Sequence, residues 1–389
     1  MASRRSIPRR LLILRSAVAL TAAAIAVAGC AGSDGESSDS ASPPATTVTS
    51  EGPPTSTAPP ATVATPTSTS TIAPTTTDTP VAQSIPTPEA STVTELLTLD
   101  RPVILAHAGG DFDGPHSTLY AFTEAVVAGV DALEMDVRLS SDGVLVVHHD
   151  NTVDRTTEAT GRVDEFSAEE LAAFDNSYWF SGSTWVDQSL PDASYVYRGI
   201  RSGDVPPPDG YTADDFAIPT FKEVAERFPD HVLDVEIKIP DDADGEPDLD
   251  AATEIARALA DEIAELDRTD SVLAVSFDDR ALAAFREFAP DVATSPGTDT
   301  LVAWYAGAEF VFAPQDVVFQ APPFFDGLEV LTAETVARAR ADGFGIWAWM
   351  DDTSSQENAD FYRYLITIGI DGIIASRNSE AIAAITPTG

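Results

Sequence analysis

The sequence predicts an α/β fold, a single (β/α)8 barrel with a loop insertion, preceded by a disordered N-terminal stalk. Residues 97–389 carry short apolar runs that alternate with longer stretches of helical period. The length and the alternation favour one barrel over two domains. By contrast, residues 31–96 contain 11 of the 28 prolines and no Lys, Arg, Phe, Trp or Tyr. Such a segment buries too little apolar surface to offset the entropy lost on ordering.

Short apolar runs, each of strand length, supply the barrel strands. Eight candidates are Val103–His107, Ala132–Val137, Val144–His148, Val232–Ile237, Val272–Phe277, Val317–Gln320, Gly345–Trp349 and Gly372–Ala375. A ninth near Ala293–Ser295 exceeds the eight places, so one run is misassigned or lies outside the barrel. Helical patterns between them include Thr118–Ala128, Ala252–Leu266, Ala281–Phe288 and Ala333–Asp342. Residues 175–217 fit no period, and we expect them to form a loop insertion over one end of the barrel.

The N-terminus predicts export. Residues 1–15 carry five arginines and no acid, and the next 14 residues are mostly apolar, too few to span a bilayer. We therefore expect a signal peptide at 1–29. It ends in Val27-Ala28-Gly29-Cys30, which resembles a bacterial lipobox and predicts lipidation of Cys30. Residues 30–96 would then be a lipidated, disordered linker that holds the folded unit, 97–389, at the membrane surface. An ordinary signal peptide with an incidental cysteine, and hence secretion, stays open, as does the twin-arginine route for Arg9-Arg10.

Charge and cysteine content exclude several functions. Lys+Arg is 22 and Asp+Glu is 63, a formal net charge of −41. Such a charge opposes binding to nucleic acid and to anionic membranes, so any membrane contact should come from the lipid anchor alone. The acidity also suits a high-salt habitat. Cys30 is the only cysteine, which excludes an intramolecular disulfide and a cysteine-ligated zinc. Nothing in the sequence indicates an oligomeric state.

Histidines gather where two predicted strands end. Four of the five, His107, His116, His148 and His149, fall within 43 residues. His107 and His149 each close an apolar run, and active sites of parallel barrels lie at the carboxyl ends of strands. The two are therefore candidates for a general acid and a general base. The alternative is that each is a hydrogen-bonded histidine at the start of a loop.

Carboxylates are spaced two apart on two of these strands. Glu134 and Asp136 share one face, and Glu236 and Lys238 repeat the spacing. Adjacent buried carboxylates repel each other and are costly to desolvate, and a bound cation removes both problems. Oxygen ligands without cysteine suit Ca²⁺ or Mg²⁺. Lys238 needs an anionic partner, for which a phosphate is a candidate. A salt-bridged polar layer is the alternative.

These motifs together resemble the glycerophosphodiester phosphodiesterase family, a TIM-barrel group of the phosphatidylinositol phospholipase C-like superfamily. The resemblance spans about 101–376 and is most specific over 131–157. Six family motifs have counterparts in this sequence. They are His107-Ala108-Gly109 for His-Arg-Gly, Pro115-His116-Ser117-Thr118 for Pro-Glu-Asn-Thr, Glu134-Met135-Asp136-Val137 for Glu-x-Asp-Val, His149-Asp150 for His-Asp, Asp154-Arg155-Thr156-Thr157 for Asp-Arg-Thr-Thr, and Glu236-Ile237-Lys238 for Glu-Ile-Lys.

The resemblance implies metal-dependent hydrolysis of glycerophosphodiesters, small or in an envelope polymer, to glycerol 3-phosphate and an alcohol. A glycerol hydroxyl would attack phosphorus, and water would then open the cyclic phosphate. His107 and His149 would be the acid and base. The remaining implied roles are Ca²⁺ or Mg²⁺ ligation by Glu134, Asp136 and Glu236, phosphate contact by Lys238, and a substrate-pocket wall at Trp347.

Two departures from the family leave the activity open. Ala108 replaces the family arginine and His116 replaces the family glutamate, which suggests that one mutual pair was lost. A positive group would then return from His116, acting as a substrate-binding residue, or from Arg198 or Arg201. The family's terminal Thr-Asp is also absent, with Ala375-Ser376 in its place. The alternatives are a catalytically weakened surface protein that binds phosphodiesters, or a related phospholipase or cyclising lyase.

Overall fold

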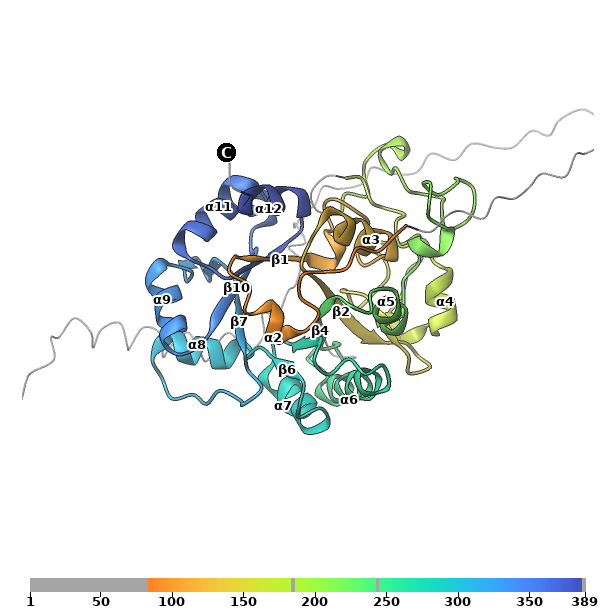
Figure 1. The fold of residues 1–389 in the computed structure, drawn as a ribbon. Helices are drawn as coiled ribbons and strands as arrows, with labels where there is room; N and C mark the ends of the chain where they lie inside the picture. Colours follow the sequence, from red (N-terminus) through yellow and green to blue (C-terminus); the bar gives the residue numbers. More distant parts are fainter. Residues whose placement is uncertain (1–82, 183–185, 243–244, 387–389) are drawn as a thin grey trace, which may run out of the picture. The chain divides into compact units, whose positions relative to one another are not determined.

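Eight parallel strands form the centre of the structure, a computed structural model that describes residues 83–182, 186–242 and 245–386. They run in the order β6-β5-β4-β2-β1-β11-β10-β7. The ring closes where Thr294 N donates to Gln315 O at 2.8 Å and Val317 N donates to Thr294 O at 3.0 Å. The predicted barrel is therefore confirmed, with its helices outside the strands (Figure 1). The strands are β1 Val103–Ala106, β2 Ala132–Leu139, β4 Val232–Ile237, β5 Val272–Val275, β6 Ala293–Thr294, β7 Val318–Ala321, β10 Gly345–Trp349 and β11 Gly372–Ala375.

The surplus strand candidate is Val144–His148, which lies outside the ring. It forms β3 (Leu145–Val147), antiparallel to the last residues of β2, whereas Ala293–Ser295 supplies the barrel strand β6. The connection from β2 to β3 turns at Gly143, which has a φ of 79°. Parallel neighbours need a crossover of a dozen or more residues, so this short connection permits only a hairpin. Phe324–Phe325 and Leu328–Glu329 form a second small hairpin, β8 and β9.

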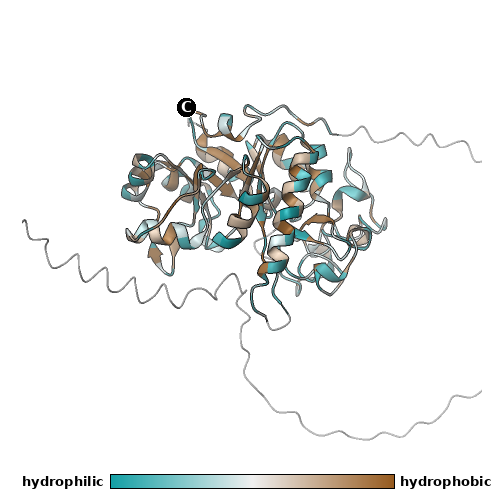
Figure 2. Ribbon diagram, turned by 90° about the horizontal axis from the view of Figure 1, so that it is seen from below, coloured by the Kyte–Doolittle hydropathy of each residue, from teal (hydrophilic) through white to brown (hydrophobic). Residues whose placement is uncertain are grey.

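The helices begin and end at residues with clear capping chemistry. Thr118 caps α3 by accepting a hydrogen bond from Ala121 N, and Gly129 ends it in the left-handed conformation. In α6, Ile255, Leu259 and Ile263 recur at helical spacing and are buried. Figure 2 shows apolar and polar residues sharing the same helices. The helices are α3 Leu119–Ala128, α4 Ala168–Ala173, α5 Phe221–Arg227, α6 Leu249–Glu265, α7 Asp279–Phe288, α8 Thr298–Ala306, α9 Ala333–Ala341, α10 Thr353–Gln356, α11 Ala359–Ile368 and α12 Asn378–Ile385.

A short helix closes the amino end of the barrel. α2 (Val93–Leu96) starts with a capping box between Thr92 and Glu95 and buries Val93 and Leu96 in the inner core. Val93 N also donates to Asp270 O, just before β5, at 2.8 Å. The ordered unit therefore begins before the predicted boundary at 97, because apolar side chains within 83–96 complete the core. The predicted signal peptide, Cys30 and most of the linker 30–96 lie outside the described residues.

The predicted insertion packs on the barrel rather than projecting from it. In residues 175–217 the described part is mostly turns, with short 3-10 helices at Asp192–Ser194 and Ala213–Phe216. Phe216 stacks on Tyr120 of α3, with ring centroids 4.7 Å apart. Within the described ranges, no helix is long and apolar enough to cross a membrane.

Candidate active site

The loop after β1 places His107 against Asp111. Residues 108–110 have φ values of 46°, 88° and 87°, three consecutive left-handed positions that reverse the chain. The reversal brings Asp111 Oδ1 to 3.0 Å from His107 Nδ1. It also directs the backbone N–H of Ala108 to Glu134 Oε2, at 2.8 Å. The loop thus connects the first histidine to the carboxylates of β2.

Three carboxylates converge at the carboxyl ends of β2 and β4. The two strands are parallel neighbours with Asp136 opposite Glu236, and Glu134 lies on the same face as Asp136. One oxygen from each of the three carboxylates lies within 4.8 Å of the others. Lys238 Nζ is 3.0 Å from Asp136 Oδ1 and 3.0 Å from Glu236 Oε1. The anionic partners of this lysine in the structure are therefore two of the carboxylates.

The carboxylates fit a divalent cation. Burial raises the pKa of Glu134 well above its usual value and also raises the pKa of Glu236. Burial also opposes ionisation of Asp136, but Lys238 and His149 outweigh it and hold the pKa far below its usual range. Asp136 Oδ2 is buried and has no hydrogen-bond partner among the described residues. A divalent cation bound by these carboxylates would satisfy that oxygen and offset the repulsion.

Three imidazole rings lie close together near the carboxylates. The ring centroid of His116 is 6.3 Å from that of His107 and 6.0 Å from that of His149. His149 Nδ1 is 2.7 Å from Asp150 Oδ1, an arrangement like that of His107 with Asp111. Each carboxylate orients its imidazole through Nδ1 and leaves Nε2 available for proton transfer. The side chains of His107 and His149 are 29% and 25% exposed, so both rings are accessible.

The pKa values of His107 and His116 are shifted in opposite directions. Burial lowers the pKa of His107, but Asp111 and Glu134 outweigh it and raise the pKa to about 10. Burial and Arg155 lower the pKa of His116 well below its usual value. His116 Nδ1 lies 2.8 Å from Ser117 Oγ, so this ring has a neutral partner.

Arg155 is a positive group near the histidines, a role that the sequence reasoning missed. Arg155 Nε donates to Asp150 Oδ2 at 2.5 Å, and its charge contributes to the lowered pKa of His116. The Asp-Arg-Thr-Thr motif marked this residue but did not indicate its direction. The expectation for Arg198 and Arg201 is not met, because both bind within the insertion and its surroundings. Arg198 Nε donates to Tyr178 O, and Arg201 Nε donates to Ala172 O.

Trp347 is not a pocket wall. It is 1% exposed and packs inside the barrel beside Val103 and Val318. Trp349, two residues further along β10 on the same face, is partly exposed and meets Phe277 edge-to-face at 5.5 Å.

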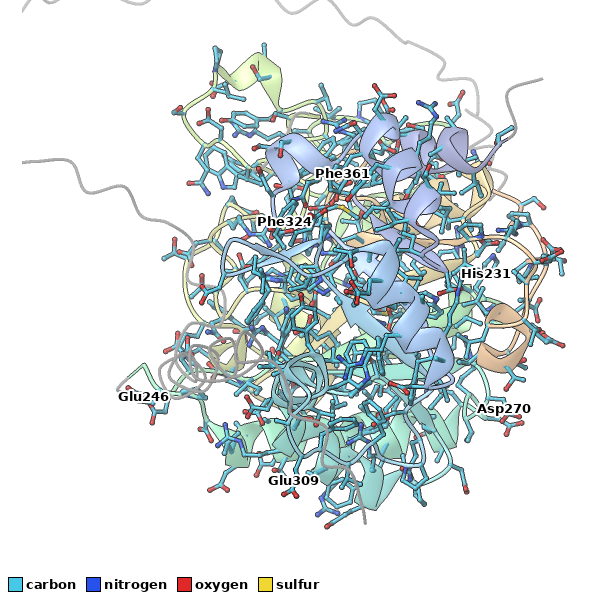
Figure 3. All side chains as sticks on the ribbon, turned by 90° about the vertical axis from the view of Figure 1, so that its left-hand side faces the viewer. His231, Glu246, Asp270, Glu309, Phe324 and Phe361 are labelled. Carbon is cyan, nitrogen blue, oxygen red and sulfur yellow. The ribbon has the colours of Figure 1, made fainter. Side chains whose placement is uncertain are left out.

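His231 lies away from the rings of His107, His116 and His149. His231 precedes β4, and Asp270 precedes β5, so both are at the amino end of the barrel. Phe324 follows β7 and Glu246 follows β4. Figure 3 shows the first pair on one side of the barrel and the second pair on the opposite side. His231 therefore lies at the opposite end of the barrel from the carboxylates of β2 and β4.

Comparison with known proteins identifies relatives of the chain. Residues 107–378 match the glycerophosphoryl diester phosphodiesterase family. A glycerophosphodiester phosphodiesterase of Caldanaerobacter subterraneus is 38% identical over 27% of this chain and 42% of its own length. Human glycerophosphodiester phosphodiesterase 1 is 40% identical over 22% of this chain and 25% of its own length. The aligned segments thus span less than half of these relatives.

Solved structures share the fold. A phosphodiesterase from Silicibacter pomeroyi has a TM-score of 0.56 at 23% identity and covers 76% of this chain and 97% of its own. One from Oleispira antarctica, solved with the product sn-glycerol-3-phosphate, has a TM-score of 0.52 at 20% identity over 73% of this chain and 97% of its own.

Proposed function

The chain belongs to the glycerophosphoryl diester phosphodiesterase family, and from this premise we propose that it hydrolyses glycerophosphodiesters to glycerol 3-phosphate and an alcohol. The observation that carries the proposal is the meeting of three carboxylates with two carboxylate-oriented histidines at one end of the barrel. The Oleispira relative, with bound glycerol 3-phosphate, supports the product side.

His107 and His149 move the protons in this proposal. One Nε2 accepts the proton of the attacking glycerol hydroxyl, and the other donates a proton to the departing alcohol oxygen. Asp111 and Asp150 accept hydrogen bonds from the Nδ1 atoms and hold the rings in place. The roles are exchanged when water opens the cyclic phosphate.

The carboxylates of Glu134, Asp136 and Glu236 would hold Ca²⁺ or Mg²⁺. When bound, the cation withdraws charge from the phosphoryl oxygens and neutralises the carboxylates. Lys238 holds Asp136 and Glu236 from the side and adds a positive charge for the phosphate. His116, beside the two acid–base histidines, contacts the substrate where the family has its glutamate.

The site of action is proposed to be the cell envelope. The lipobox-like sequence ending at Cys30 supports an exported lipoprotein, and the Pro/Thr/Ser-rich residues after it give the chain length between the lipid anchor and the barrel. Substrates would be small phosphodiesters or an envelope polymer that reaches the barrel mouth.

Product analysis tests the proposal. The full chain is incubated with glycerophosphocholine or glycerophosphoglycerol in Ca²⁺, Mg²⁺ or EDTA, and the phosphorus species are followed by ³¹P NMR. Glycerol 3-phosphate formed only with the metals supports the proposal. Persistent cyclic phosphate indicates a cyclising lyase. Ala108 in place of the family arginine favours a second candidate, a phosphodiester-binding protein, which would bind these compounds without turnover in any condition.

A further inference from the structure

The carboxylate that orients the first histidine comes from an unexpected element. Asp111 belongs to the loop after β1, four residues beyond His107, and is 9% exposed. Ser376 follows β11 at the place of the family's Asp, and its Oγ lies 3.4 Å from His107 Nδ1. A carboxylate on position 376 would therefore also reach the imidazole. The chain carries a hydroxyl at the strand end and a carboxylate in the loop.

The local backbone is shaped to deliver Asp111 there. The N–H groups of Gly110 and Asp111 donate to His107 O at 2.6 and 3.2 Å and close a tight turn. A Cβ added to Gly110 would lie 2.1 Å from Asn378 Nδ2, and φ at Gly110 is 87°. Asn378 Nδ2 also donates to Gly109 O at 3.2 Å, which ties the turn to the start of α12. This turn is therefore held in one conformation from both sides.

The surroundings keep Asp111 charged and directed at the imidazole. Burial raises its pKa, but His107 and the hydroxyl of Ser376 outweigh burial and lower the pKa to about 2. Glu357 lies behind, accepting hydrogen bonds from Ser376 N at 3.0 Å and from the Tyr362 hydroxyl. Burial raises the pKa of Glu357 to about 7. Asp111, the more readily ionised of the two acids, is therefore the one that contacts His107, whereas Glu357 binds Ser376 N and the Tyr362 hydroxyl.

We propose that Asp111 is the positioning residue of His107, taking from the loop the role that a carboxylate at position 376 would otherwise fill. It accepts the Nδ1 proton, fixes the tautomer with Nε2 unprotonated in the neutral ring, and holds the ring toward the phosphodiester. The catalytic part of this inference rests on the proposed function, whereas the tautomer does not.

Three variants of the full chain test the role. In Asp111→Asn the amide no longer enforces an Nδ1 donor, so we expect kcat on glycerophosphocholine with Ca²⁺ to fall by about 10²-fold or more with KM within about twofold. The double variant Asp111→Asn/Ser376→Asp restores a carboxylate beside Nδ1 and should recover most of the loss. Asp113→Asn is the matched control, because Asp113 is an exposed acid of the same loop whose carboxylate accepts from the start of α12, at Ser379 N, and not from a histidine.

A spectroscopic readout separates this inference from the proposed function. In protein labelled with ¹⁵N-histidine and brought to a pH above the raised pKa of His107, the neutral ring should carry its proton on Nδ1, and Asp111→Asn should lose this preference. An Nε2-protonated neutral ring in the unaltered chain would overturn the proposal, even if no variant folds. Unchanged kcat in Asp111→Asn, or no recovery on adding Ser376→Asp to a folded protein, would also count against it. If the unaltered chain has no activity, the proposed function fails while the tautomer still decides the positioning role.

Discussion

Glu134→Gln is the sharpest test of the cation site. The substitution removes one charge but retains an amide oxygen that can accept the 2.8 Å hydrogen bond from Ala108 N. Because burial raises the pKa of Glu134, ionising it costs the metal-free protein stability at neutral pH. The ligand oxygens lie within 4.8 Å of one another, and two unit charges at that separation repel by about 3.5 kcal/mol at an effective dielectric constant of about 20. We therefore expect the metal-free variant to be more stable than the unaltered chain, by up to about 3 kcal/mol.

With Ca²⁺ present, the unaltered chain should gain more stability than Glu134→Gln, the opposite of the order expected without metal. At a Ca²⁺ concentration of about 100 times Kd, binding stabilises the unaltered chain by about 2.7 kcal/mol, or roughly 5 °C in Tm for a domain of this size. Losing a ligand should weaken binding by at least about 10²-fold, so the Ca²⁺-induced shift should fall below about 1 °C. Differential scanning calorimetry in EDTA and in Ca²⁺ measures both quantities.

The control and the pH dependence make the result specific. Glu262→Gln on α6 removes the same charge from another acid, whose pKa burial raises to about 7, and should retain the full Ca²⁺ shift. The folded-state pKa of Glu134 lies above its unfolded value near 4.5, so its penalty is absent below that pH and grows as pH rises through the folded pKa. The metal-free advantage of Glu134→Gln should grow in the same direction. A variant with the normal Ca²⁺ shift, or with a lower metal-free Tm, would refute the reasoning.

Three further predictions concern charge around the site. Lys238→Met leaves two buried carboxylates without their 3.0 Å partner, so the free energy of unfolding, measured with urea in EDTA, should fall by about 3–5 kcal/mol. Lys222→Met removes only a surface ion pair and should leave the urea midpoint unchanged. Ala108→Arg alone should gain no turnover, because Ala108 is fully buried at a φ of 46°. The double variant Ala108→Arg/His116→Glu should turn over substrate faster than Ala108→Arg. Equal turnover in the single and double variants would contradict the idea that a mutual pair was lost. KM for glycerophosphoglycerol, a net anion, should fall between about 10 and 150 mM NaCl as the Debye length shortens from about 30 to 8 Å, and a monotonic rise in KM would contradict this expectation.

The sequence predicted the barrel and the convergence of the carboxylates because both follow from short-range periodicity. Residues two apart on a strand share a face, so Glu134 and Asp136 had to point the same way. Parallel pairing of β2 with β4 then brings Glu236 opposite Asp136. The run Val144–His148 was harder, because apolar composition does not distinguish a barrel strand from a hairpin partner. Only the short connection after β2 carried that information.

Depth and direction were beyond the sequence pattern. Trp347 and Trp349 have the same parity, but only the fold shows that Trp347 lies in the closed core and Trp349 nearer the carboxyl end of the strand. Likewise, long arginine side chains reach several places. Arg198 rests on aromatic rings of the insertion, 3.9 Å from the Tyr195 centroid, while Arg155 turns toward Asp150. Such choices depend on tertiary packing, which no local period encodes.

Electrostatics links the cation to substrate entry as well as to the reaction. Residues 101–389 contain 17 basic and 55 acidic residues, so the field of the domain opposes an approaching phosphodiester. At the mouth, Lys238 is already engaged by Asp136 and Glu236, and Arg155 by Asp150. The charges of Lys238 and Arg155 are therefore largely neutralised by carboxylates in contact with them. A bound divalent cation would reverse this local balance, so the ligand set that would activate the phosphoryl group would also make the site attractive to an anion.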